Sequence, residues 1–268
     1  MSNKTETLWV VGGGNMGGAL LARWCDAGSA DEIVLIDPAD VPVPYPAVKV
    51  DKAATAGPAP SILVLAVKPK HVVDVAAGLR DHITAETIVV SVIAGLSVGA
   101  MARLFPGARH VRAMPNTPTQ VGKGVTGLYA DNLDERSRAA IDTLFASTGD
   151  AYWLPDEGQF DALTAVSGSG PAYLFHMVEA LCAAGTAAGL DEDMAGKLAR
   201  ATVIGAGALL DQDPRSARDL RVAVTSPGGT TQAGLEALTG DPGLPGAVRA
   251  AVRAAATRSR EMATEIDA

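Results

Sequence analysis

The chain has 268 residues, of which 48% are hydrophobic and 19% charged, enough apolar content to bury one large core or two medium ones. A formal net charge of -8 argues against a nucleic-acid partner, because phosphate binding needs Lys and Arg clustered on one face. No apolar run reaches the roughly 18 residues of a membrane helix, and glycines interrupt the start before a secretory core forms, so we expect a cytoplasmic protein with no membrane partner.

Short apolar segments alternate with helix-length segments over about the first 155 residues. Strands that are apolar on both faces are typical of a parallel sheet covered by helices on both sides. The pattern therefore predicts an α/β domain of the Rossmann type. The expected strands are LWVVG (8–12), EIVLID (32–37), SILVLAV (61–67), TIVVSVI (87–93), HVRAM (within 109–114) and GVTGLY (124–129).

A glycine motif follows the first expected strand directly. Gly12, Gly14 and Gly17 have the G-x-G-x-x-G spacing, and Asn15 and Met16 lie between the last two of them. In this arrangement the first glycine allows the turn, the second lets the main chain approach a pyrophosphate, and the third lets helix and strand pack. We expect these five residues to bind a dinucleotide; the alternative is a purely structural glycine turn.

Asp37 stands 20 residues after Gly17, at the end of the second expected strand. A carboxylate at this point hydrogen-bonds the adenosine ribose diol and repels a 2′-phosphate. The next three residues, Pro-Ala-Asp, contain no cation that could bind such a phosphate. The sequence thus favours NADH over NADPH, with Lys52 as the nearest cation to propose as a phosphate partner. The alternative is that Asp37 only caps a turn.

Three more segments follow strand ends at the edge of the sheet where ligands bind. The main chain of Ala66, Val67, Lys68 and Pro69 is expected to line the cofactor crevice, although a Lys before a Pro is ordinarily just solvated. Ala94 follows the strand at 87–93 and belongs to the same predicted site. Asn116 lies in a rigid Pro-Asn-Thr-Pro loop that could orient the nicotinamide or form an ordinary turn.

The pattern changes near residue 158. From Phe160 onward strand patterning gives way to long helices rich in Ala, Leu and Gly, with Gly189 ending one helix and Asp191 capping the next. We therefore expect a Rossmann domain at 1–158 and an all-helical domain at 159–268. About 110 residues of Ala-rich helix bury little apolar surface by themselves, so the sequence predicts an obligate homo-oligomer. Tight packing within one chain is the alternative.

The cysteines and histidines do not suggest a metal centre. Cys25 and Cys182 are isolated in the sequence, with no metal-type spacing, and are expected to be buried thiols. The four histidines are scattered along the chain, so no metal site is predicted.

Five motifs, taken in order and spacing, resemble the pyrroline-5-carboxylate reductase family: VGGGNMGGAL, LAVKPK, VRAMPNTPTQVGKG, SGSGPAYLF and VTSPGGTTQAGL. The match runs from about Leu8 to Leu238. The resemblance implies NAD(P)H-dependent reduction of 1-pyrroline-5-carboxylate to L-proline, the last step of proline biosynthesis. It also implies a helical domain that interlocks with its partner in a dimer, with decamers in some members, and a substrate site at the dimer interface between the cofactor crevice and the SPGGTT loop.

Two departures from the family pattern concern the cofactor. Many members carry Ser, or Asn followed by Arg, where this chain has Asp37, and relatives often have Asn at Asp51-Lys52. The first difference weakens the expectation that the frequent NADPH preference of the family applies here, and the second alters the adenosine contact expected at that position.

The SPGGTT loop is the expected substrate site. A cyclic imine with a carboxylate needs an anion site, a partner for the ring nitrogen and a face open to the hydride donor. Paired glycines can take positive φ and turn their N–H groups inward, and a helix starting at Thr231 adds its positive end. We expect the main chain of Ser226, Gly228, Gly229 and Thr230 to hold the carboxylate. The resemblance places the Thr231 hydroxyl at the ring nitrogen; otherwise Thr231 is only an N-cap.

The remaining motif and the rival functions complete the sequence interpretation. The glycines of SGSGPAY indicate close main-chain approach, and packing is favoured over catalysis.

A hydroxyacid or ketopantoate type of reductase would use a helical-domain lysine as acid, but Lys197 has no adjoining Asn in helical register. A nucleotide sensor without catalysis is the other alternative, and the intact SPGGTT loop argues against it.

Overall fold

The computed structural model describes residues 5–267, which form two compact units. One unit contains the residues up to Gly168 together with those from Ala255 onward, and the other is Ser169–Ala254. No helix in the described residues is long and apolar enough to cross a membrane.

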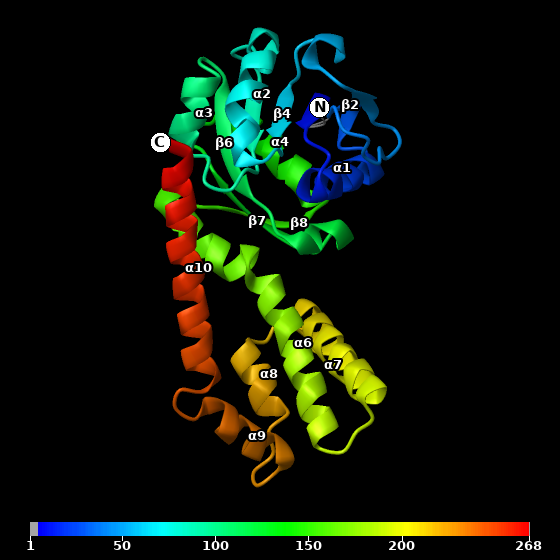
Figure 1. Cartoon of the computed structure of the whole chain (residues 1–268), viewed down its shortest axis with the longest axis vertical. Helices are drawn as coiled ribbons and strands as arrows, with labels where there is room; N and C mark the ends of the chain where they lie inside the picture. The colour runs from blue at the N-terminus through cyan, green and yellow to red at the C-terminus, as the bar shows by residue number, and fades with distance from the viewer. Residues whose placement is uncertain (1–4, 268) are drawn as a thin grey trace. The chain divides into compact units, whose positions relative to one another are not determined.

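The first unit is built on one eight-stranded sheet with the order β3-β2-β1-β4-β5-β6-β7-β8. Figure 1 shows strands of this sheet with helices beside them. All six predicted strands are present within a few residues of the expected bounds. The strands are β1 (Thr5–Val11), β2 (Ala30–Ile36), β3 (Val48–Val50), β4 (Ile62–Leu65), β5 (Ile88–Ser91), β6 (Arg109–Met114), β7 (Gly124–Tyr129) and β8 (Gly149–Trp153).

The sheet is parallel, as predicted, except at one place. Strand β7 runs antiparallel to β6, and β8 then runs parallel to β7. A parallel crossover needs about a dozen residues or more, and the segment between Met114 and Gly124, which contains the short helix η4 (Thr117–Val121), is shorter than that. The two edge strands β3 and β8 were not predicted, because they are short and only partly buried.

Helices cover both faces of the sheet, as predicted. Alternate residues of β1 enter opposite cores: Leu8 and Val10 pack with α1 (Asn15–Ala27) and α4 (Glu135–Ala146). On the other face, Trp9 and Val11 pack with α2 (Val72–Leu79) and α3 (Val98–Leu104). This two-sided burial is the reason that the strand sequences are almost continuously apolar.

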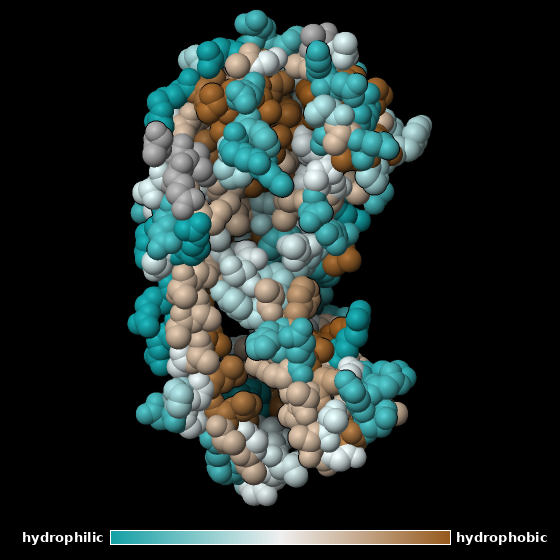
Figure 2. Space-filling model, viewed as in Figure 1, coloured by the Kyte–Doolittle hydropathy of each residue, from teal (hydrophilic) through white to brown (hydrophobic). Residues whose placement is uncertain are grey.

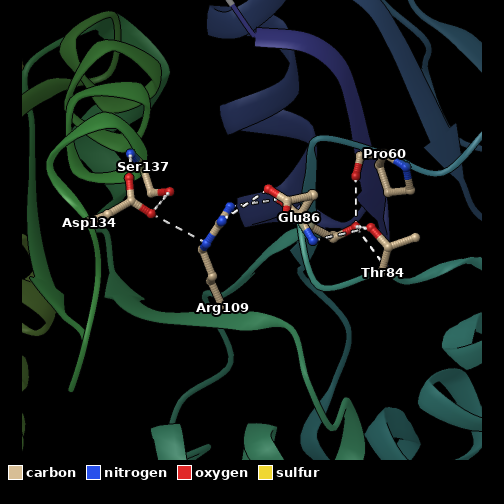
Figure 3. A network of polar contacts seen from close by, with 7 residues as sticks. Pro60, Thr84, Glu86, Arg109, Asp134 and Ser137 are labelled. Carbon is tan, nitrogen blue, oxygen red and sulfur yellow. Dashed lines mark hydrogen bonds and ion pairs between the residues drawn. The ribbon is translucent and has the colours of Figure 1, made fainter.

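Polar contacts close the amino-terminal edge of the sheet (Figure 3). Arg109, at the start of β6, donates to Glu86 at 3.0 Å and forms an ion pair with Asp134 at 3.4 Å. Asp134 caps α4 by accepting from the Ser137 N–H at 2.8 Å, and this bond lowers the pKa of its carboxyl. A hollow of about 470 Å³ beside these residues also lies at the amino-terminal edge, so it is not the predicted cofactor crevice.

The second unit is helical. It contains α6 (Gly170–Ala187), α7 (Glu192–Gln212), α8 (Ala217–Ala223), α9 (Thr230–Thr239) and the beginning of α10 (Gly243–Asp267). The predicted end of α6 and start of α7 are confirmed. Gly189, after the end of α6, has a φ of +103°, and Asp191 accepts from two first-turn N–H groups of α7.

The helical unit has little core of its own. Its buried apolar side chains are Ala195, Ala199 and Leu220, whereas Phe175 and Ile204 are 65% and 61% exposed. Figure 2 shows hydrophobic side chains on the surface of these helices. Cys25, in the first unit, is buried as predicted, and burial raises the pKa of its thiol. Cys182 is only half-buried, contrary to the prediction, because the unit around it is so thinly packed.

The compact units divide later than the predicted boundary at residue 158. Helix α5 (Phe160–Leu163) and the π-helical turn η6 (Thr164–Gly168) belong to the first unit. The last part of α10 belongs there too, and the Ser259 hydroxyl donates to Asp161 Oδ1 at 2.7 Å. The helical part of the chain therefore begins about where the sequence predicts, but its helices are divided between the two compact units.

Candidate active site

The residues predicted to bind the cofactor all follow the carboxyl ends of neighbouring strands. In the sheet order, Asp37 follows β2, Gly12 to Gly17 follow β1, Ala66 to Pro69 follow β4, Ala94 follows β5, and Asn116 follows β6. Carboxyl ends of parallel strands share one edge, so five separate parts of the sequence are brought together where α/β proteins bind ligands.

The glycine turn fits a bound pyrophosphate. Gly12 has a φ of +99°, and a Cβ there would lie 2.7 Å from the Ala66 carbonyl oxygen, so only glycine fits. A Cβ on Gly17 would collide with the Gly12 carbonyl, whereas a Cβ on Gly14 would meet open space. Gly14 is the N-cap of α1 and offers no capping side chain, so the first-turn N–H groups remain available to an anion.

Asp37 is held beside this turn by two main-chain donors. Its Oδ2 accepts from the Gly13 N–H at 2.7 Å, and its Oδ1 accepts from the Ala39 N–H at 2.8 Å. The second bond is the turn cap considered as the alternative for Asp37, and the first joins the same carboxylate to the glycine motif. The carboxylate is therefore fixed next to the expected adenosine end, whichever dinucleotide binds.

The structure also places Lys52, which the sequence could not. Val50 pairs with Ile36 in parallel register and accepts from the Asp37 N–H at 3.1 Å. Lys52 comes two residues after Val50 and is exposed at the same edge of the sheet as Asp37. A cation is thus available near the acid that favours NADH.

The Asn116 side chain is buried and occupied. It is 7% exposed; its Nδ2 donates to the Ser167 carbonyl at 3.0 Å, and its Oδ1 accepts from the Val125 N–H at 2.8 Å. The amide therefore ties β7 and the π-helical turn η6 to the loop after β6. A cofactor contact by Asn116 stays a prediction, and it falls to the main chain because the amide already has partners. No sequence signal links Asn116 with Ser167.

The glycines of SGSGPAY differ in how closely other atoms approach them. A Cβ on Gly168 would lie 3.1 Å from the Met114 methyl carbon, which confirms close packing there. A Cβ on Gly170 would meet nothing within 4 Å. Packing within the first unit therefore accounts for Gly168 alone.

The SPGGTT loop forms a tight turn before α9. The Gly229 N–H donates to the Ser226 carbonyl at 3.0 Å, with Pro227 second and Gly228 third in the turn. Gly228 has a φ of +69°, as position three of a type II turn requires. Gly229 has a φ of -82°, so the expected pair of glycines with positive φ is not formed.

Helix α9 begins one residue earlier than expected. Its first residue is Thr230, its N-cap is Gly229, and no side chain caps it. Thr231 is therefore not an N-cap. The Gly228 N–H is already taken by Gln232 Oε1 at 2.8 Å, so the first-turn N–H groups, including those of Thr230 and Thr231, are the donors left for an anion. The side chains of Ser226, Thr230 and Thr231 are exposed.

The loop carries no strong acid or base of its own. Lys197, the residue that the rival reductase would need, pairs with Asp193 one helical turn away on α7. Across residues 5–267, no cluster of three His, Cys, Asp or Glu side chains could hold a metal ion. The geometry suits binding and orientation of an anionic substrate.

Comparisons with known proteins give matches to both parts of the chain. A family model described as pyrroline-5-carboxylate reductase dimerisation matches residues 157–262, and one described as NADP oxidoreductase, coenzyme F420-dependent, matches residues 7–95. The pyrroline-5-carboxylate reductase of Synechocystis sp. is 37% identical over 264 residues, covering 95% of this chain and 97% of that protein. The enzyme of the same name from Mycobacterium tuberculosis is 38% identical, covering 94% and 95%.

Solved structures give the same result. A pyrroline-5-carboxylate reductase from Coxiella burnetii has a TM-score of 0.87 and 30% identity, covering 96% of this chain and 98% of that one. A pyrroline carboxylate reductase from Plasmodium falciparum, solved with NADP bound, has a TM-score of 0.82 and 26% identity, covering 96% and 98%.

The Asn116 contacts generate a stability prediction. Asn116→Asp should destabilise the protein by about 2 to 4 kcal/mol, because a carboxylate cannot donate to the Ser167 carbonyl and would repel it. Urea unfolding followed by circular dichroism measures the change. Asn132→Asp, at an exposed position, is the matched control and should shift the midpoint little. An unchanged midpoint in Asn116→Asp would contradict the assigned contacts.

Proposed function

The chain belongs to the pyrroline-5-carboxylate reductase family, and from that premise we propose how its residues reduce the imine of 1-pyrroline-5-carboxylate to L-proline. The enzyme is an NAD(P)H-dependent oxidoreductase that acts on a CH–NH group. The observation that carries the proposal is that α1 and α9 each begin at a glycine without a capping side chain. Each helix start is an anion site: one suits the cofactor pyrophosphate and the other the substrate carboxylate.

The cofactor half consists of the residues at the carboxyl edge of the sheet. Gly12, Gly14 and Gly17 make room for the pyrophosphate, with the N–H groups at Asn15 and Met16 beside it. The strand-end segment Ala66 to Pro69, together with Ala94 and the main chain of Asn116, lines the rest of the crevice. When bound, the reduced nicotinamide supplies the hydride for the imine carbon.

The substrate half is the SPGGTT loop with the first turn of α9. We assign the carboxylate chiefly to the N–H groups of Thr230 and Thr231, since the Gly228 and Gly229 N–H groups have acceptors within the loop. Ser226, Gly228 and Gly229 then shape the turn that presents those donors. The Thr231 hydroxyl oxygen accepts a hydrogen bond from the ring N–H as the protonated imine becomes a secondary amine.

Orientation is the main catalytic contribution of the protein. An imine that arrives protonated needs no strong acid, which suits a loop whose functional groups are hydroxyls and main-chain amides. Fixing the carboxylate at one end and the ring nitrogen at the other leaves the ring little freedom, and such positioning lowers the barrier to a bimolecular step.

NADH is the proposed preferred donor. The Asp37 carboxylate, fixed against the glycine turn, would accept from the ribose hydroxyls and repel a 2′-phosphate. The exposed Lys52 is the group that could offset this repulsion and admit NADPH.

A homodimer is the proposed working form. The family match includes a dimerisation domain, and exposed apolar side chains on α6 and α7 provide a surface for a second copy of the chain. Assembly of dimers into decamers and a cytoplasmic location stay predictions.

Removal of the Thr231 hydroxyl tests the substrate half. Thr231→Ala should lower kcat with pyrroline-5-carboxylate by about 10- to 100-fold, the usual cost of a hydrogen bond to a charged group, while the KM for the dinucleotide stays nearly unchanged. Thr231→Ser should retain most of the rate. Thr239→Ala is the control on the same helix, since its hydroxyl donates only to carbonyls within α9. Equal losses in turnover and dinucleotide affinity would count against the role of Thr231.

Initial rates with NADH and NADPH test the cofactor assignment. Wild type should turn over faster with NADH, and Asp37→Ser should shift the ratio of kcat/KM values toward NADPH by about tenfold or more, because a unit negative charge is removed near the 2′ position. Asp40→Asn removes the same charge from an exposed neighbouring site and should leave the ratio unchanged. A wild-type preference for NADPH would refute the assignment and direct the next substitution to Lys52.

A charged substitution tests the dimer. Ile204→Glu should convert the protein toward single chains of 27.3 kDa in sedimentation velocity, because burying an unpaired carboxylate in an apolar interface is costly. Gln212→Glu, exposed on the same helix, should leave the mass unchanged. If both variants sediment like wild type, this face of α7 is not the interface.

A further inference from the structure

Gln232 is the third residue of α9, and its side chain bonds back to the loop before the helix. With Gly229 as N-cap, Thr230, Thr231 and Gln232 are the first three helical residues. A glutamine at the third position commonly forms one arm of a capping box, in which its side chain reaches back to the N-cap N–H while an N-cap hydroxyl accepts from the third N–H. Gln232 makes a backward bond of this kind, to the Gly228 N–H at 2.8 Å, one residue further back.

The reciprocal arm of the box is missing. Gly229 has no side chain that could accept from the first-turn N–H groups. A Cβ on Gly229 would lie 2.5 Å from Ser226 Oγ and 3.1 Å from the Ser226 carbonyl oxygen, so the turn leaves no ready space for Ser or Thr at this position. The place where a cap oxygen normally sits is therefore left to a group from outside the chain.

Gln232 also fixes the orientation of the turn. The N–H and C=O of one peptide point in opposite directions, so holding the Gly228 N–H toward α9 turns the Pro227 carbonyl away from Gln232. Type I and type II turns differ by a flip of this central peptide. The amide is itself held in place, since its Nε2 donates to Glu236 Oε1 at 2.8 Å, and Gln232 is half-buried.

We propose that Gln232 is a positioning residue for the substrate: it supplies one arm of the capping box, and the carboxylate of the imine supplies the missing cap oxygen to the free first-turn N–H groups of α9. By occupying the Gly228 N–H, Gln232 removes a competing donor and directs the carboxylate to the helix start. This inference rests on the proposed function, because it assigns the carboxylate to the same loop.

The test compares two imines that differ only in the carboxylate, pyrroline-5-carboxylate and 1-pyrroline. In Gln232→Met, kcat/KM for pyrroline-5-carboxylate should fall about tenfold, mainly through KM, and the affinity for L-proline measured by calorimetry should weaken by a similar factor. The value for 1-pyrroline and the KM for NADH should change less than about twofold. Gln212→Met, at an exposed position on α7, is the matched control.

A second variant tests the missing arm directly. Gly229→Ser, which the turn admits once the Ser226 hydroxyl rotates away, offers a hydroxyl at the cap position. This hydroxyl should compete with the substrate carboxylate and raise the KM for pyrroline-5-carboxylate more than that for 1-pyrroline. Circular dichroism and thermal unfolding verify that both variants fold.

The outcomes separate this inference from the proposed function. Equal losses with both imines in Gln232→Met, or unchanged kinetics with pyrroline-5-carboxylate, would overturn the positioning role while leaving the reductase assignment intact. Absence of any imine-dependent oxidation of NADH or NADPH by wild type would instead overturn the proposed function.

Discussion

Unpaired main-chain N–H groups at helix starts are the physical constraint on which both halves of the site depend. Every α-helix leaves about four such donors, and each needs an acceptor. Helices α3, α4, α7 and α8 satisfy theirs with the side chains of Ser97, Asp134, Asp191 and Ser216. Helices α2, α5 and α6 continue from a preceding helical turn, which contributes carbonyl acceptors. Helices α1 and α9 instead have a glycine N-cap and no side-chain cap, and both helix starts lie in the motifs assigned to anionic ligands.

Neighbouring atoms crowd the glycine motif before α1 and the N-cap of α9, whereas Gly14, the N-cap of α1, has open space where a Cβ would lie. At α1, the close approach of Gly12 to the Ala66 carbonyl excludes a side chain and brings the ends of β1 and β4 together. At α9, Ser226 closes off the side of Gly229 where a Cβ would point. At both helix starts the glycine N-cap offers no side-chain acceptor, so no internal group competes with a ligand for the first-turn N–H groups.

The sequence predicts those features that depend on local patterns. Strand composition predicted six strands, glycine spacing predicted the tight turn between β1 and α1, and Asp191 predicted a helix start, because each signal lies within a few residues. The antiparallel direction of β7 could be predicted only by comparing the short β6–β7 connection with the length that a parallel crossover needs. Strand β8 was missed because it is an edge strand with a weak apolar pattern. The bond from Asn116 to Ser167 spans 51 residues and leaves no local trace. Gln232 did carry a signal, a glutamine in the third helical position, which became interpretable only once the helix was known to begin at Thr230.

The SPGGTT loop, the proposed substrate site, lies in the part of the chain with the least core, and this explains why local hydrogen bonds matter so much there. Neither α6 nor α9 has a buried residue. Packing within the unit therefore does little to fix the loop, in contrast to the glycine turn of α1, which is anchored on a buried sheet. The Ser226–Gly229 turn, the bond from Gly228 to Gln232 and the bond from Gln232 to Glu236 form a continuous chain of contacts that can hold the loop in one geometry. Preorganisation by short-range hydrogen bonds thus replaces preorganisation by a core, and the loss of one link should affect carboxylate recognition more than stability.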